Sequence, residues 1–169
     1  MDWYTILIIA HIVGVALGVG GATFAEVNLV YAKRDGEISP DENALMQSTY
    51  AVLRLGFFLL VLSGFGFLLY YRLSGAEELL YSSALWAKFA VIGILSASAV
   101  LMQLRLIPLL WGSAVSITSW YAALVLGVFA RGDVNSSYVT IFSIYALAVV
   151  TMYYILQLIH KKFVPHKEH

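Results

Sequence analysis

The chain has 169 residues, of which 61% are hydrophobic and only 12% are charged, and its mean hydropathy is +0.84. Soluble domains carry about 25% charged residues, so this composition argues against a water-soluble enzyme and indicates an integral membrane protein. Ten Lys and Arg balance ten Asp and Glu, which leaves no basic excess for binding nucleic acid. The chain has no Cys, so disulfides, zinc–thiolate centres and Cys-ligated iron–sulfur clusters are excluded.

Five apolar stretches are long enough to cross a bilayer, because about 20 apolar residues span roughly 30 Å of hydrocarbon. In chain order they cover about 3–31, 55–71, 84–110, 114–130 and 138–158. A lipid-exposed backbone must satisfy its own hydrogen bonds, so each stretch is expected to be a helix. We therefore predict an all-α integral membrane bundle of five transmembrane helices, formed by residues 1–160 as a single domain, with a polar cytoplasmic tail at 161–169.

Local signals mark several helix ends. Ser39, Pro40 and Glu42 have the spacing of a capping box with proline at the first helical position, which predicts a helix that starts near Pro40. We expect this helix to run along the interface before it enters the bilayer, and we expect Pro108 to kink or end the third helix. Tryptophans favour membrane interfaces, so four of them near span ends are expected to be anchors: Trp3, Trp86, Trp111 and Trp120.

Basic residues are distributed unevenly over the two sides that five spans create. One side has the basic residues Lys33, Arg34, Lys161, Lys162 and Lys167. The other side has Arg72 and Arg131 together with the acidic residues Asp2, Glu77, Glu78 and Asp133. The positive-inside rule then predicts an outer N-terminus and a cytoplasmic C-terminus for a multi-pass membrane protein.

Ionisable residues inside a span cost at least ~2.5 kcal/mol at mid-bilayer, which makes them candidates for function. His11 lies in the first span and shares a helix face with Gly14, Gly18 and Ala22, which we call the small-residue face. Such a face permits close approach of another helix, including a second copy or a partner membrane protein. The same pattern fits a histidine that ligates haem iron beside a groove for a planar macrocycle.

Lys88, near the start of the third span, is the second candidate. Helical rise places His11 about 12 Å below Trp3 and Lys88 about 6 Å below the start of its own span, so their depths overlap. We predict that His11 and Lys88 share one site in the outer leaflet, where the cation suits a propionate or another carboxylate. The alternative is that Lys88 snorkels to the membrane surface.

Glu26 is about 22 Å further along the first helix than His11 and therefore lies near the cytoplasmic face. Arg54 and Arg105 are near the same face, so we expect an inner polar cluster in which Glu26 pairs with an arginine. This cluster is either a topology-fixing ion pair or an inner gate or proton port. His160 lies at the same inner depth, so it cannot ligate the same iron as His11.

Two short motifs suggest a family. The segment from His11 to Gly14 with the glycines that follow, and then Trp86-Ala87-Lys88, resembles small bacterial membrane proteins grouped with the HemJ-type protoporphyrinogen oxidases and the copper-resistance-D-like proteins. The resemblance implies a compact helical bundle and a bound b-type haem, with His11 as the haem-linked histidine and Lys88 as a functional lysine. Glu26 departs from the pattern of the oxidases, which indicates an uncharacterised sister family.

The sequence therefore predicts a membrane redox protein that binds haem b or a porphyrin, with a haem-dependent oxidoreductase as the candidate enzyme class. In this hypothesis His11 binds iron or accepts a proton, the small-residue face receives the ring, and Lys88 pairs with a carboxylate. Two other functions stay open. One is a non-enzymatic small subunit that binds a larger membrane complex through the small-residue face, and the other is a small transporter or channel whose path is lined by the ionisable residues.

Overall fold

The computed structural model describes residues 2–34, 38–76, 80–81, 83–129 and 137–163. The helices are α1 (Trp3–Ala32), α2 (Pro40–Leu73), α3 (Ser83–Gln103), α4 (Leu109–Phe129) and α5 (Tyr138–Phe163). No strand occurs in the described residues, and all five helices are long and apolar enough to cross a membrane. The prediction of an all-α chain with five such helices is confirmed, and the chain has the character of a multi-pass membrane protein.

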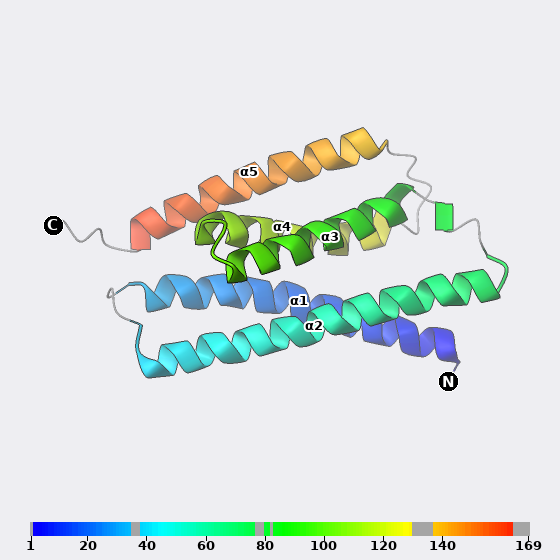
Figure 1. Ribbon diagram of the computed structural model, residues 1–169, viewed down its shortest axis with the longest axis horizontal. Helices are drawn as coiled ribbons and strands as arrows, with labels where there is room; N and C mark the ends of the chain where they lie inside the picture. The colour runs from blue at the N-terminus through cyan, green and yellow to red at the C-terminus, as the bar shows by residue number, and fades with distance from the viewer. Residues whose placement is uncertain (1, 35–37, 77–79, 82, 130–136, 164–169) are drawn as a thin grey trace.

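The helices form two groups (Figure 1). α1 and α2 lie antiparallel as a closely packed hairpin, and α4 packs against both α3 and α5. α4 also packs on α1 and so joins the two groups. Among the described helices, α1 is the only one whose backbone lies close to that of α2. α2 and α3 therefore stay apart, which leaves the space described below as a cavity. The start of α1 and the end of α5 lie at opposite ends of the bundle.

Glycines bring the backbones of α1 and α2 into contact. A Cβ placed on Gly14 would lie 2.7 Å from the backbone nitrogen of Leu60, and one placed on Gly56 would lie 2.8 Å from that of Gly18. Real Cβ atoms do not approach backbone atoms so closely, so neither glycine can be replaced without moving a helix. The small-residue face of α1 is thus a helix contact within this chain.

Trp120 fills the other side of this face. A Cβ on Gly18 would lie 2.0 Å from Cζ3 of Trp120, so the indole ring packs directly on the glycine. Trp120 lies in the middle of α4, is 1% exposed, and belongs to the core together with Ala22 and Leu60. The prediction that Trp120 is an interfacial anchor is wrong, because the glycine creates space for a large ring in the core. Three tryptophans near helix starts are exposed: Trp3, Trp86 and Trp111.

The predicted helix starts have well-defined caps. The hydroxyl and the backbone N–H of Thr5 both donate to the carboxylate of Asp2, which lowers the pKa of that carboxyl and caps α1. The capping box before α2 is confirmed: Glu42 N–H donates to Ser39 Oγ over 3.2 Å, and Ser39 N–H donates to Glu42 Oε2 over 2.8 Å. Both caps satisfy backbone donors that the first turn of a helix leaves unpaired.

Several boundaries differ from the prediction. α2 is one continuous helix of 34 residues, about 51 Å long, and its early part packs on α1 through a 3.0 Å bond from Asn28 to Thr49. It is therefore not divided into an interfacial segment and a span. α3 ends at Gln103, five residues before Pro108, and α5 continues to Phe163, past the predicted start of the polar tail. Residues 164–169 of that tail lie outside the described residues.

Candidate functional site

A cavity of about 680 Å³ lies where α2 and α3 stay apart, and we call it the α2–α3 cavity. Side chains from α1, α2, α3 and α4 line it, and most of them are aliphatic or aromatic. Its aromatic lining consists of Tyr4, Phe57, Phe65, Phe67, Tyr71 and Phe89. His11 and Lys88 also line this cavity, and they are the side chains of the lining that carry an ionisable nitrogen. Small-molecule sites are commonly apolar cavities of about 300–1,000 Å³ with a few polar groups, so this one has the usual size and character.

The structure brings His11 and Lys88 together, as their helical depths predicted. Nζ of Lys88 lies 2.8 Å from Nε2 of His11, and both side chains are partly buried. Lys88 therefore extends toward the interior of the bundle to meet the imidazole, and the alternative of a lysine that snorkels away from it is wrong. Helix α3 supplies the lysine and α1 the histidine, so the contact joins the two groups of helices.

The hydrogen bonds around His11 define its tautomer. Ser63 on α2 lies 2.9 Å from Nδ1 of His11, and its single hydroxyl proton goes to the carbonyl oxygen of Leu59 at 2.5 Å. Ser63 Oγ must therefore accept the Nδ1–H of the imidazole. The ammonium of Lys88 has only donors, so Nε2 carries the lone pair that accepts from it. This pattern corresponds to the His11 tautomer with a proton on Nδ1 and with Nε2 facing Lys88.

Aromatic rings hold the imidazole in place. Phe67 packs edge-on against His11 with ring centroids 5.4 Å apart, and Tyr4 packs edge-on against Phe67 at 5.8 Å. On the side of α4, Gly127 lies beside the lysine: a Cβ there would be in ordinary van der Waals contact with Nζ of Lys88, at 3.5 Å. Ser63 was not predicted as a site residue, because it acts through a contact between helices that are distant in the chain.

The small-residue face takes no part in this cavity. Gly14, Gly18 and Ala22 are absent from its lining, because α2 and the ring of Trp120 cover the face. The prediction that these three residues receive a planar ring is therefore wrong. The same packing excludes the face as a docking surface for a partner helix or a second copy.

Glu26 has a different partner from the one predicted. Its Oε1 lies 2.8 Å from Nε2 of His160, and the two side chains are 10% and 19% exposed. The last turn of α5 lies beside the end of α1 and brings the imidazole there. Arg54 and Arg105 are exposed, and neither bonds to Glu26 in the described part of the chain, so the predicted Glu26–arginine pair is wrong. The common depth of Glu26 and His160 was the sequence signal for their pairing.

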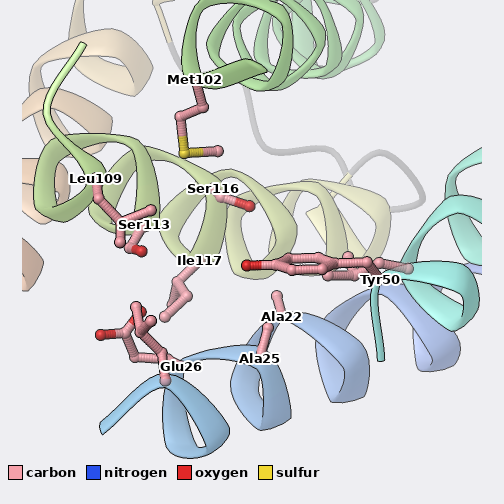
Figure 2. Close-up of a pocket in the computed structure, with 11 residues that line it drawn as sticks. Ala22, Ala25, Glu26, Tyr50, Met102, Leu109, Ser113, Ser116 and Ile117 are labelled. Atoms are coloured by element: carbon pink, nitrogen blue, oxygen red, sulfur yellow. The ribbon is translucent and has the colours of Figure 1, made fainter. Parts of the chain in front are cut away.

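A second, smaller cavity of about 50 Å³ lies beside Glu26, and we call it the Glu26 cavity (Figure 2). It lies between α1, α2, α3 and α4 and has Tyr50, Ser113 and Ser116 on its wall. No residue lines both cavities. The chain thus carries two separate polar sites, one at His11 and one at Glu26.

Neither site has enough side-chain ligands to form a metal centre by itself, because no three His, Asp or Glu side chains come together in the described residues. His11 is the imidazole of the larger cavity and can offer a single nitrogen ligand to a metal that a cofactor brings with it. Comparisons of the chain with protein-family models, with curated proteins and with solved structures found no match. The function is therefore inferred from the geometry and chemistry of these residues.

Proposed function

We propose that the protein is a membrane redox protein that binds haem b or another porphyrin in the α2–α3 cavity, with His11 as iron ligand or proton acceptor. The observation that carries the proposal is the 2.8 Å contact between Lys88 Nζ and His11 Nε2 on the wall of a large, mostly apolar cavity. An imidazole and an ammonium are the two groups that a porphyrin site needs, one for the centre of the ring and one for a peripheral carboxylate.

The tautomer of His11 fits the role of iron ligand. A metal-bound imidazole usually donates its other ring N–H to an oxygen acceptor, which orients the ring and raises its basicity. Ser63 is that acceptor here, and the lone pair is on Nε2, the nitrogen that faces Lys88. The aromatic lining and the cavity volume suit a flat, apolar macrocycle. A bound haem would supply one-electron redox chemistry.

Lys88 has two tasks in this proposal. Its ammonium occupies the hydrogen-bonding position at Nε2, so it must move aside before that nitrogen can bind iron. The lysine side chain is long and flexible, so its ammonium can move without a change in the backbone. After this movement the ammonium pairs with a carboxylate of the ligand. For a porphyrin without iron, the same lone pair on Nε2 accepts a proton, and the neighbouring ammonium stabilises the carboxylate.

The location of the protein is part of the proposal. Basic residues lie beside the end of α1 and in the last turn of α5, and the positive-inside rule supports a cytoplasmic position for that end of the bundle. The His11 site then lies in the outer half of a bacterial inner membrane and the Glu26 site in its inner half.

Absorption spectroscopy tests the proposal. We expect the protein, purified in detergent from haem-replete cells or titrated with haemin, to show a Soret band that is lost in His11→Ala. Glu26→Gln is the matched control, because Glu26 is about 22 Å away along α1 and should leave the band unchanged. A wild-type protein that stays colourless after titration, or a band that survives in His11→Ala and disappears in Glu26→Gln, would contradict haem binding at His11.

A further inference from the structure

The Glu26 cavity is large enough to hold water. Its volume of about 50 Å³ can accommodate roughly three water molecules, because one water needs about 10–15 Å³ of such space. Alanine, leucine, isoleucine and methionine side chains form most of its wall. The polar lining consists of Glu26 from α1, Tyr50 from α2, and Ser113 and Ser116 from α4.

Three hydroxyl groups that line this cavity lack a partner in the described segments. None of the described residues forms a hydrogen bond with the hydroxyl of Tyr50, Ser113 or Ser116. Several other serines in these helices bond to a carbonyl one turn earlier, as Ser119 does to Val115 over 2.7 Å. Figure 2 shows the three hydroxyls directed into the space above Glu26. Ser113 and Ser116 are partly buried and Tyr50 is 38% exposed, so water that enters the cavity can bond to these hydroxyls.

The carboxyl group of Glu26 borders this space, and only one of its two oxygens has a partner in the described part of the chain. Oε1 accepts from His160, while no described residue donates to Oε2. With a neutral His160 the pair carries one negative charge inside an apolar helical bundle, and one added proton makes the pair neutral. Intramembrane carboxylate–imidazole pairs beside water are the usual elements of proton relays.

We propose that Glu26, His160 and the water of the Glu26 cavity form a proton-exchange site. A proton from a cavity water is taken up by the Glu26–His160 pair, whose net charge changes from −1 to 0, and it returns to water on release. The exchange makes and breaks only O–H and N–H bonds, and no electrons are transferred. The site is separate from the His11–Lys88 contact, so this proposal does not depend on haem binding.

Few other titratable groups border this cavity, so the Glu26–His160 pair is its main proton acceptor. Tyr50 is the only further titratable side chain in the described lining, and α4 and α3 contribute hydroxyls and the thioether of Met102. The charged side chains at this end of the bundle in the described segments that do not line the cavity are Lys33, Arg34, Asp41, Glu42, Arg54, Arg105, Lys161 and Lys162.

Infrared difference spectroscopy of the detergent-purified protein between about pH 5 and pH 9 tests the proposal. We expect a change in a glutamate carboxyl band and a change in an imidazole band, because the two groups share one hydrogen bond beside the cavity. The carboxyl change should be lost in Glu26→Gln and the imidazole change in His160→Gln. Two variants are used so that a folding defect in one leaves the other informative. If neither band changes over this range, or if both bands survive in both variants, the proposal is wrong.

The water is tested separately with serine variants. The double variant Ser113→Ala/Ser116→Ala should lose the weakly hydrogen-bonded water bands of the same difference spectrum. Ser98→Ala is the matched control, because this buried serine on α3 bonds to its own helix backbone and lines neither cavity. Water bands that persist in the double variant would overturn the hydrated site. Suppression of the carboxyl change by NaCl, but not by choline chloride at equal ionic strength, would instead show that a metal cation occupies it.

Discussion

Ser63 shows how one small side chain can determine the chemistry of a histidine. Its hydroxyl proton is committed to the backbone of α2, so its oxygen accepts from Nδ1 of His11 and directs the lone pair of the imidazole to Nε2. A methyl group in place of this hydroxyl would leave Nδ1–H without its acceptor in a largely apolar region, at a cost of about 1–3 kcal/mol. Without this hydrogen bond, the orientation of the imidazole with Nε2 toward Lys88 would be less stable.

Ser63→Ala should therefore weaken the affinity for haem by about 10- to 100-fold, the usual effect of losing a partner behind a metal ligand. The measurement is a haemin titration followed at the Soret band. Ser98→Ala is the control, because it also removes a buried hydroxyl that bonds to its own helix. Equal affinities of the two variants would show that Ser63 does not position His11.

Among the helices, α1 is the central element because its faces meet different partners. Glycines on one face allow α2 to approach at backbone distance and Trp120 of α4 to pack against Gly18. His11, displaced around the same helix, faces the α2–α3 cavity. α2 thus packs closely on α1 at Gly14 and Gly56 but stays away from α3. The space between α2 and α3 is the cavity.

Two glycines of α1 allow a matched test of this packing. Gly14→Ala would place a methyl group 2.7 Å from the backbone of Leu60, so we expect a loss of about 1–3 kcal/mol in stability from overpacking. Gly20→Ala meets nothing within 4 Å and should leave the stability unchanged or raise it by up to about 1 kcal/mol through helix propensity. Thermal unfolding in detergent compares them, and identical unfolding temperatures would contradict the contact.

At the scale of the whole molecule, the two polar sites lie toward opposite ends of the bundle. His11 and Glu26 are separated by about 22 Å along α1, and Gly18 with its covering Trp120 lies between them. Trp120 belongs to a hydrophobic core that also includes Leu60 and Ala114. The proposed porphyrin site and the proposed proton-exchange site are therefore expected to work from different sides of the membrane.

Reporter fusions test this orientation. Fusions after Arg34 and after His169 should both report a cytoplasmic position, because both points adjoin the basic residues beside the end of α1 and the last turn of α5. An alkaline phosphatase reporter, active only outside the cytoplasm, should be inactive at both points, and a fluorescent reporter that folds only in the cytoplasm should be bright. A signal from the outer side at both positions would reverse the orientation.

Sequence alone determined the features that depend on local physics. Span length and hydropathy predicted five helices, the Ser39–Glu42 spacing predicted a capping box, and helical rise predicted that His11 and Lys88 share a depth. Each follows from residues close together in the chain or from the fixed geometry of a helix.

Only the tertiary structure decided which faces meet. It placed Trp120 in the core, covered the small-residue face with α2, paired Glu26 with His160 and set Ser63 behind His11. The physical reason is that contacts between helices depend on the rotation and crossing of each helix, which arise from packing all five together. An apolar helix in a membrane protein carries too little contrast between its faces for the sequence to reveal that rotation.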